Sequence, residues 1–533
     1  ASDVYKRQLY QYDQYFDAEN GCDLHTTLDT TIQYYLEKGV QELEARFGTG
    51  KGAEGIVMDV NTGAVLAMAS LPTYDLNSPG TVYNDFLTSG MTEEQVLENM
   101  SDLLNKQWRS KAINDTYEPG STFKTLTLAM ALEENVVDLN TGFYCSGSVK
   151  IEGETINCSK RAPGHGQQNL TQAFANSCNP AFINIGLRIG NDKFYQYMLD
   201  FGLTEKTGVD TTGEASGFVN SEIKYSTLAL ACYAFGQNFN VTPIALLAAQ
   251  CACVNGGYLY TPYLVEEITD QDGNVVSKHD STPIRQVVSE ETSALVRDIM
   301  EYEVTSGTGK NGQVAGYRIG GKTGTADKGQ TGDVVVSFLC FAPADDPQVI
   351  MLITMDTPSR ATGTYVSGGN MVAPTASTVM AEILPYLGVE PSYSAEELLG
   401  MDTTVPNVIG MSVEEAKAKL KDRALSYKIV GDGETITDQT PAGGAIIPGK
   451  SSVILYVGEE KSTDKCVVPH LIGKTPSEAN TTATAAGLLI RFSGTTGSES
   501  SSVRVLSQSI DEGTEVEAGT VITVQLGDTS VTD

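Results

Sequence analysis

Three short motifs bring together residue types that can carry out acyl transfer. In chain order they are Ser121-Thr122-Phe123-Lys124, Ser177-Cys178-Asn179 and Lys322-Thr323-Gly324-Thr325. A serine hydroxyl becomes a nucleophile when a nearby unprotonated lysine accepts its proton. A second hydroxyl can relay a proton, an amide can hold a peptide group, and a second lysine can bind a carboxylate. Together, S-x-x-K, S-x-N and K-T-G predict an enzyme with a serine nucleophile.

The surroundings of Ser121 suit a nucleophile. Tyr117-Glu118-Pro119-Gly120 predicts a sharp turn, and the apolar run STFKTLTLAMALEE predicts a helix directly after it. The hydroxyl of Ser121 would then lie at a helix N-terminus, where backbone N–H groups and the helix dipole favour negative charge. Lys124 follows one turn later on the same face. Helix capping is the alternative role for Ser121, and the two accompanying motifs favour catalysis.

Other matches to the same short patterns lack this context. Ser221 to Lys224 has no turn before it, and Ser462 to Lys465 lies in a charged linker. Lys206-Thr207-Gly208 lies at a helix-to-loop junction and is interpreted as a surface turn. We therefore assign the chemistry to Ser121 and Lys322.

The remaining two motifs occupy places where a substrate could be held. Lys322 follows two glycines near the strand-rich end of the domain, and small residues on an edge strand let a peptide lie against its backbone. Ser177 and Asn179 lie between the end of one helix and the start of the next. Capping is again the alternative role for this pair.

The elements that must position these residues predict an α+β domain. A helix is expected from about Asp23 through TTLDTTIQYYLEKGVQELEARF, and further helices between about 90 and 255. Strands come before and after these helices, so the order is not that of alternating βαβ units. Two hairpins are predicted, in which residues 55–60 pair with 64–69 and residues 334–341 pair with 349–355.

The C-terminal part of the chain contains an internal repeat. Val405-Pro406-Asn407-Val408-Ile409-Gly410 recurs as Val468-Pro469-His470-Leu471-Ile472-Gly473. Each copy is followed by a helical run and a final strand, so each predicts a small helix-and-strand module. A stretch rich in Pro, Ser, Glu and Thr after Leu387 marks the boundary before them.

Length and charge narrow the class of protein further. A chain of 533 residues is too long for one hydrophobic core. Its net charge of -32 disfavours nucleic acid and anionic membrane surfaces as partners. No run of 18 or more apolar residues is present.

Histidine and cysteine spacing predicts neither a metal nor a cofactor. The four histidines, His25, His165, His279 and His470, show no ligand spacing, and His165 is interpreted as a loop residue. The nine cysteines include no C-x-x-C pair. Cys145 and Cys158 bracket a predicted hairpin, where a disulfide, a redox switch or two separate thiols remain open.

The motifs YEPGSTFK, NSCNPAF and GGKTGTA resemble those of class B penicillin-binding proteins. The resemblance covers residues 24–390 and implies a penicillin-binding, β-lactamase-like transpeptidase domain, with an antiparallel sheet flanked by helices and a helical subdomain. A linker would span 391–403. Residues 404–458 and 465–528 resemble PASTA domains. The second has Ile510 where the first has Pro441, which weakens the case for ligand binding there.

The same resemblance implies a mechanism for peptidoglycan cross-linking. Ser121, deprotonated by Lys124, would attack the penultimate D-Ala carbonyl of a D-Ala-D-Ala donor, and an acceptor amine would then take the acyl group. Ser177 would relay a proton and Asn179 would hold the acyl-side amide. β-Lactams would acylate the same serine.

Binding of the donor's terminal carboxylate is assigned by the resemblance to the third motif. Lys322 and Thr325 would contact it together with Thr323, while Gly324 completes the substrate-binding strand. Backbone N–H groups of Ser121 and Thr325 would form the oxyanion hole.

The family also implies a place in the cell. Residues 1–23 are interpreted as two parts. Ala1 to Gln8 resemble an adapter-derived tail, and the residues after them are interpreted as the remnant of a truncated N-terminal region. We expect the extracytoplasmic face of the membrane of a Gram-positive bacterium, an N-terminal anchor missing from this chain, and partners among cell-wall synthesis or divisome proteins. Division, sporulation and elongation roles are not distinguished.

Competing functions use the same motifs. A D,D-carboxypeptidase or a serine β-lactamase would transfer the acyl group to water, and a non-catalytic wall sensor would rely on the repeats. Intact Ser121, Lys124 and Lys322 argue against the sensor. Motif order, local context and the appended modules together favour the transpeptidase.

Overall fold

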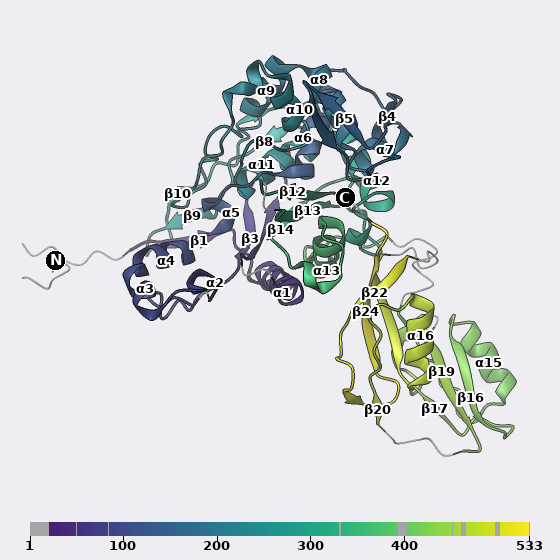
Figure 1. Ribbon diagram of the computed structural model, residues 1–533. Coiled ribbons are helices and arrows are strands. Elements are labelled where there is room, and N and C mark those ends of the chain that lie inside the picture. The colour runs from purple at the N-terminus through teal and green to yellow at the C-terminus, as the bar shows by residue number, and fades with distance from the viewer. Residues whose placement is uncertain are drawn as a thin grey trace, which may run out of the picture.

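The computed structural model describes residues 21–48, 51–83, 85–329, 332–392, 402–449, 451–459, 465–495 and 502–531. These residues form one large α+β body followed by two small modules, which lie at its lower right in Figure 1. The predicted adapter-like residues lie outside the described residues, as does most of the predicted linker.

A five-stranded antiparallel sheet, in the order β12-β13-β14-β2-β3, lies at the centre of the body. The strands are β2 (Ala53–Asp59), β3 (Val65–Ser70), β12 (Gly320–Asp327), β13 (Val334–Ala342) and β14 (Val349–Asp356). Both predicted hairpins are confirmed, as β2–β3 and β13–β14, and they share this sheet. The strand that carries the K-T-G motif, β12, lies at its edge.

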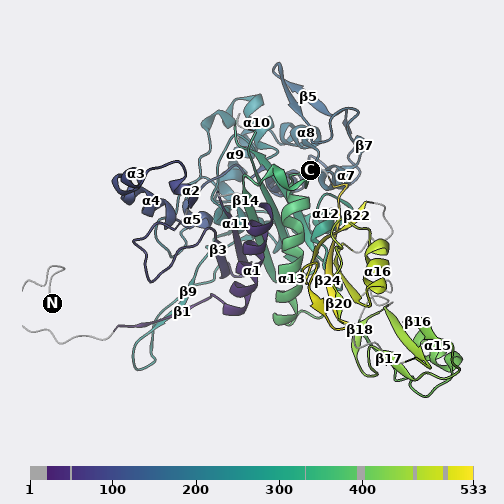
Figure 2. The same ribbon diagram turned by 60° about the horizontal axis from the view of Figure 1, so that its bottom comes forward.

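The two faces of the sheet follow the alternation of side chains along its strands. Val57 packs with helices α1 (Thr30–Phe47) and α13 (Ala373–Tyr386), which run side by side in Figure 2. Ile56 and Met58 face the opposite side and join the core of the helical part of the body. The sheet is therefore covered on both faces, which confirms the predicted α+β class.

The helical part of the body supports the first two motifs. Its main helices are α6 (Lys124–Glu133), α7 (Leu170–Ala175), α8 (Asn179–Ile189), α9 (Asn191–Asp200), α10 (Thr227–Tyr233), α11 (Pro243–Val254) and α12 (Glu290–Ser306). Helix α11 is buried along its whole length, as its apolar sequence predicts. The side chain of Thr242 caps it, and Pro243 occupies its first turn, where a proline is tolerated.

Shorter elements complete the body. The helices are α2 (Asp85–Thr88), α3 (Glu93–Glu98), α4 (Met100–Gln107) and α5 (Lys111–Asn114). The strands are β4 (Phe143–Cys145), β5 (Ser148–Ile151), β6 (Glu154–Asn157), β7 (Gly166–Gln168), β8 (Tyr258–Leu259), β9 (Val265–Thr269), β10 (Val275–Lys278) and β11 (Arg285–Gln286). Strands β5 and β6 form the hairpin predicted between Cys145 and Cys158.

The helix predicted from about Asp23 begins later than expected. Asp23–Thr26 form strand β1, which pairs antiparallel with β9. The helix starts at Thr30 because the Asp29 carboxylate accepts the backbone N–H groups of Thr31 and Ile32, at 2.8 and 3.0 Å. A distant strand partner, which the local sequence does not reveal, determines the conformation of β1.

Both C-terminal modules have the same topology. In each, a parallel and an antiparallel strand flank the central strand of a three-stranded sheet beside one helix. The first contains β15 (Asp402–Thr404), α15 (Val413–Lys421), β16 (Ser426–Gly431), β17 (Asp438–Thr440), β18 (Ile446–Pro448) and β19 (Ser452–Val457). The second contains β20 (Cys466–Val467), α16 (Pro476–Ala485), β21 (Leu489–Gly494), β22 (Val503–Gln508), β23 (Glu515–Val516) and β24 (Val521–Asp528).

The second module docks on the body through the end of β24. The Asp528 backbone N–H donates to Oδ1 of Asn311 at 2.6 Å, and its carboxylate pairs with Lys310. The side-chain amide of Asn370 donates to the carbonyl of Val531 at 2.8 Å. Burial opposes ionisation of Asp528, but hydrogen bonds led by Lys310 lower its pKa to about 2.

Candidate active site

Ser121 lies in a tight turn that leads directly into helix α6. The turn is a short 3-10 helix, Gly120–Phe123, and Gly120 adopts a left-handed φ of 56°. A methyl group on Gly120 would lie 2.9 Å from Cβ of Ala326 on β12, so glycine is needed for this close approach. The turn therefore holds the partly exposed Ser121 against the edge strand.

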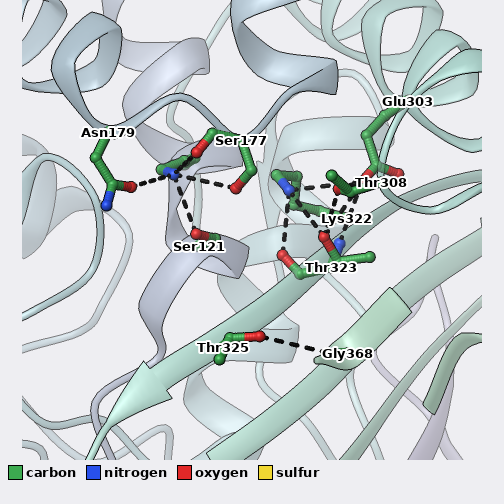
Figure 3. A network of polar contacts seen from close by, with 10 residues as sticks. Ser121, Ser177, Asn179, Glu303, Thr308, Lys322, Thr323, Thr325 and Gly368 are labelled. Atoms are coloured by element: carbon green, nitrogen blue, oxygen red, sulfur yellow. Dashed lines mark hydrogen bonds and ion pairs between the residues drawn. The ribbon is translucent and has the colours of Figure 1, made fainter. Parts of the chain in front are cut away.

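Lys124 connects the first two motifs through its side-chain nitrogen. Its Nζ lies 3.0 Å from Oγ of Ser121, 3.1 Å from Oγ of Ser177 and 2.7 Å from Oδ1 of Asn179. In Figure 3 these three labelled residues surround one unlabelled nitrogen, to which dashed lines connect them. Nζ of Lys124 also donates to the carbonyl of Ser177 at 2.6 Å. The lysine is fully buried, so these oxygens replace its hydration shell.

Ser177 and Asn179 are positioned by the junction between α7 and α8. Ser177 has a φ of 50°, a strained value for a residue other than glycine, and is only 3% exposed. Asn179 begins α8, and its Nδ2 donates to the carbonyl of Asn157 at 3.0 Å. This contact fixes the amide so that its oxygen faces Lys124.

Lys322 and Thr323 lie in a second polar group on β12. Nζ of Lys322 is 3.5 Å from Oε1 of Glu303 on α12, and 3.2 Å from Oγ1 of Thr323. The Thr323 hydroxyl lies 2.6 Å from that of Thr308, which donates to Glu303 at 2.7 Å. All four side chains are buried. Thr323 thus points toward supporting residues, while Lys322 is held by a carboxylate.

The last two residues of the third motif have different surroundings. Thr325 is partly exposed, and its Oγ1 accepts the N–H of Gly368 at 3.4 Å. A methyl group on Gly324 would lie 2.3 Å from Oγ of Ser337 and 2.9 Å from Cγ2 of Thr122. Gly324 therefore permits the serine-bearing turn to pack on β12.

The two polar groups lie side by side, as Figure 3 shows. Nζ of Lys124 lies 5.6 Å from the ring centre of Phe182, and Nζ of Lys322 lies 5.6 Å from that of Phe174. The two rings are themselves in contact, with centroids 6.0 Å apart. Two buried lysine side chains therefore lie on adjacent rings within one site of a strongly acidic protein, and a protonated lysine there would favour a carboxylate ligand.

Sequence reasoning missed Glu303 and Thr308. Glu303 occupies a helical position between the buried residues Met300 and Val304, where an apolar side chain is expected. A glutamate at a core position of an amphipathic helix is the signal that could have found it, because a buried charge requires a partner. Thr308 follows the helix end and offers no comparable signal.

The competing short motifs lie elsewhere. Ser221–Lys224 form a separate 3-10 turn in which Nζ of Lys224 contacts the ring of Tyr195 at 4.2 Å. Thr207 donates its hydroxyl to Glu214 at 2.7 Å, consistent with a surface turn. Ser462 lies outside the described residues.

One set of metal-ligating side chains lies close together among the described residues, behind the start of α8. It comprises Cys145, Cys158, His165 and Cys178.

Comparisons with known proteins agree with this arrangement. Residues 55–381 match the penicillin binding protein transpeptidase domain family, and residues 403–459 and 467–528 match the PASTA domain. Stage V sporulation protein D of Bacillus subtilis is 37% identical over 85% of this chain and 68% of its own length.

Two further relatives extend the comparison. A probable peptidoglycan D,D-transpeptidase FtsI of Caulobacter vibrioides is 30% identical over 69% of this chain and 60% of its own length. The crystal structure of penicillin binding protein 3 from Mycobacterium tuberculosis, complexed with aztreonam, has a TM-score of 0.60 at 26% identity. The match covers 70% of this chain and 81% of the Mycobacterium tuberculosis chain. The chain therefore belongs to the penicillin-binding protein transpeptidase family, as a peptidoglycan D,D-transpeptidase with two C-terminal PASTA domains.

Proposed function

We propose that Ser121 forms the acyl-enzyme through which this chain cross-links peptidoglycan stem peptides. The single observation that carries the proposal is the contact of 3.0 Å between Nζ of Lys124 and Oγ of Ser121. A lysine at this distance, when unprotonated, can take the hydroxyl proton as Oγ attacks the penultimate D-Ala carbonyl.

The proton then follows a short path to the leaving group. Lys124 Nζ is also 3.1 Å from Oγ of Ser177, so the proton can pass through that hydroxyl to the departing amine of the terminal D-Ala. Cleavage of the peptide bond leaves an ester on Ser121. An acceptor amine attacks this ester, a new peptide bond forms, and Ser121 regains its proton.

Substrate binding is assigned to both polar groups. Lys322 and Thr325 would bind the terminal carboxylate, with Thr323 and Glu303 orienting the Lys322 ammonium group. Asn179 would hold the acyl-side amide. The serine-bearing turn packs on residues 324–326, which supports backbone N–H groups of Ser121 and Thr325 as the oxyanion hole.

β-Lactams would enter the same site as mimics of the donor, and the relative complexed with aztreonam supports this assignment. The names of two relatives support roles in sporulation or in division. We place the enzyme on the extracytoplasmic face of a Gram-positive cell membrane, where it would work with other cell-wall synthesis or divisome proteins. No described helix has the length and apolar character to cross a bilayer.

The proposal is tested on glycan chains polymerised beforehand by a separate glycosyltransferase. After incubation with this chain and muramidase digestion, mass spectrometry should reveal cross-linked dimers and released D-Ala. Ser121→Ala should abolish both products. Ser221→Ala is the matched control in the competing S-x-x-K motif and should retain them.

Other outcomes would separate the alternatives. Release of D-Ala without dimers would indicate a carboxypeptidase. Rapid turnover of a chromogenic cephalosporin would indicate a β-lactamase. Dimers formed by Ser121→Ala would contradict the proposed nucleophile.

A further inference from the structure

Three thiols and one imidazole converge directly behind the Ser177–Asn179 turn. The ligand atoms of Cys145, Cys158, His165 and Cys178 all lie within 4.8 Å of one another. The three cysteines are buried and His165 is partly buried. The acyl-transfer mechanism uses none of these side chains, so their convergence needs a separate explanation.

The four residues come from four different places in the fold. Cys145 ends β4, Cys158 directly follows β6, His165 lies in the loop before β7, and Cys178 directly precedes α8. Strand β4 and helix α8 lie together at the upper right of the body in Figure 1. The fold therefore brings together ligand atoms that lie apart in the sequence.

The spacing of the ligand atoms suits a tetrahedral ion. Zinc bound at about 2.3 Å to sulfur and about 2.0 Å to an imidazole nitrogen, with tetrahedral angles, sets adjacent S and N atoms about 3.5 Å apart. Sγ of Cys158 and Nδ1 of His165 are 3.5 Å apart. The other pairs of ligand atoms lie within 4.8 Å of each other. If these atoms moved closer together, all four could coordinate one ion.

One backbone donor contacts a sulfur atom of the cluster directly. The backbone N–H of Gly147 donates to Sγ of Cys145 at 3.4 Å. Such outer contacts to the ligand atoms are typical of metal sites.

We propose that Cys145, Cys158, His165 and Cys178 bind one zinc ion as a structural site. Three thiolates and an imidazole match the ligand preference of Zn²⁺, and four protein ligands leave no position for a substrate. The sequence spacing has no C-x-x-C pair, which is why it predicts no metal. His165 does lie in a loop, as its sequence indicates, but its ring reaches the thiols.

The ion would position two residues of the acyl-transfer site. Cys178 lies between Ser177 and Asn179, and Cys158 follows Asn157, whose carbonyl holds the Asn179 amide at 3.0 Å. Zinc would thus tie the start of α8 to the β5–β6 hairpin and maintain the strained φ of Ser177. This link to catalysis rests on the proposed function, whereas the metal site itself does not.

Zinc binding and a disulfide between Cys145 and Cys158 exclude each other. A disulfide would remove two of the four ligands. In the structure all three cysteines are thiols. The test must therefore distinguish a metal from an oxidised pair.

The first measurement is the metal content of the full chain, purified in reducing buffer without chelator. Elemental analysis by inductively coupled plasma mass spectrometry should find one zinc ion per chain. Replacing zinc with Co²⁺ should produce two spectral features, a thiolate-to-cobalt charge-transfer absorption and the intense visible bands of tetrahedral cobalt. His165→Ala and Cys145→Ser should each lose most of the zinc. Cys253→Ala, a buried cysteine on α11 outside the cluster, is the matched control and should keep it.

The second measurement separates the metal site from the proposed function. Removing zinc with a chelator should slow acylation by benzylpenicillin at least tenfold, and adding zinc back should restore the rate.

Three outcomes would overturn the metal site. They are a chain without zinc after purification, a Cys145–Cys158 disulfide in peptide maps, and normal zinc content in folded His165→Ala. If a variant does not fold, the zinc content and cobalt spectrum of the unaltered chain decide. Zinc binding without any acylation would instead count against the proposed function.

Discussion

Nζ of Lys322 and Oε1 of Glu303 lie 3.5 Å apart, and both side chains are 0% exposed. The pair joins the K-T-G strand β12 to helix α12. Thr308 donates to the same carboxylate oxygen at 2.7 Å, so Glu303 has a hydrogen-bonded support of its own. The lysine proposed to bind the substrate carboxylate is therefore held in a dry, charged setting before any substrate arrives.

Replacing Glu303 by Ala should destabilise the fold and impair donor binding. The change leaves the buried Lys322 ammonium without this carboxylate, which typically costs about 3–5 kcal/mol. The double replacement Glu303→Met with Lys322→Met should recover most of the stability and none of the acylation rate. Thermal unfolding and penicillin labelling measure the two effects. An unchanged unfolding midpoint for Glu303→Ala would contradict the ion pair.

The Glu54 carboxylate should make stability fall as pH rises. Burial raises its pKa from 4.5 to about 7, and the hydrogen bond from Thr354 at 2.8 Å only partly offsets this effect. The folded state thus binds more protons between these values. The contribution of Glu54 to the free energy of unfolding is complete below pH 4.5 and is lost as pH rises through about 7. The total loss is about 3 kcal/mol.

Chemical denaturation at pH 5 to 8 compares the unaltered chain with Glu54→Gln, so that the effects of other titrating groups cancel in the difference. The glutamine variant should gain relative stability as pH rises. A difference that does not change with pH would show that Glu54 does not titrate in this range.

The docking of the second PASTA module should depend on Asp528 and Lys310. Asp528 is 5% exposed and its carboxylate pairs with Lys310, so Asp528→Ala removes a buried interdomain contact. Hydrogen exchange should increase in residues 308–312 and in β24. A double-mutant cycle with Lys310→Ala should give a coupling of about 0.5–3 kcal/mol. Additive effects of the two changes would contradict a direct interaction.

Gly39 should resist substitution despite its place inside helix α1. A methyl group there would lie 2.5 Å from Cγ2 of the buried Val379 on α13. Gly39→Ala should gain about 1 kcal/mol in helix propensity and lose about 1–3 kcal/mol through overpacking. Adding Val379→Ala should relieve the overpacking, so Gly39→Ala should cost less in that background. Equal effects of Gly39→Ala in both backgrounds, measured by thermal unfolding, would contradict this contact.

Local patterns predicted much of the fold. The two β-type runs at 55–60 and 64–69 predicted the β2–β3 hairpin, and YEPGSTFK predicted the turn that carries Ser121. Strand β1 was missed because its partner β9 is remote in sequence. The cysteine cluster was missed for the same reason, since only the folded chain brings its ligand atoms together. Glu303 could have been found as a glutamate at a core position of helix α12, but its partners Lys322 and Thr308 become apparent only in the folded chain.

The most direct test of the central claim is intact-mass spectrometry after treatment with benzylpenicillin. The unaltered chain and Ser221→Ala should each gain the mass of one benzylpenicillin, and tryptic mapping should place it within residues 112–124, which contain Ser121. Ser121→Ala should gain nothing. An adduct on Ser121→Ala, or one that maps to another peptide, would contradict the assignment of Ser121 as the nucleophile.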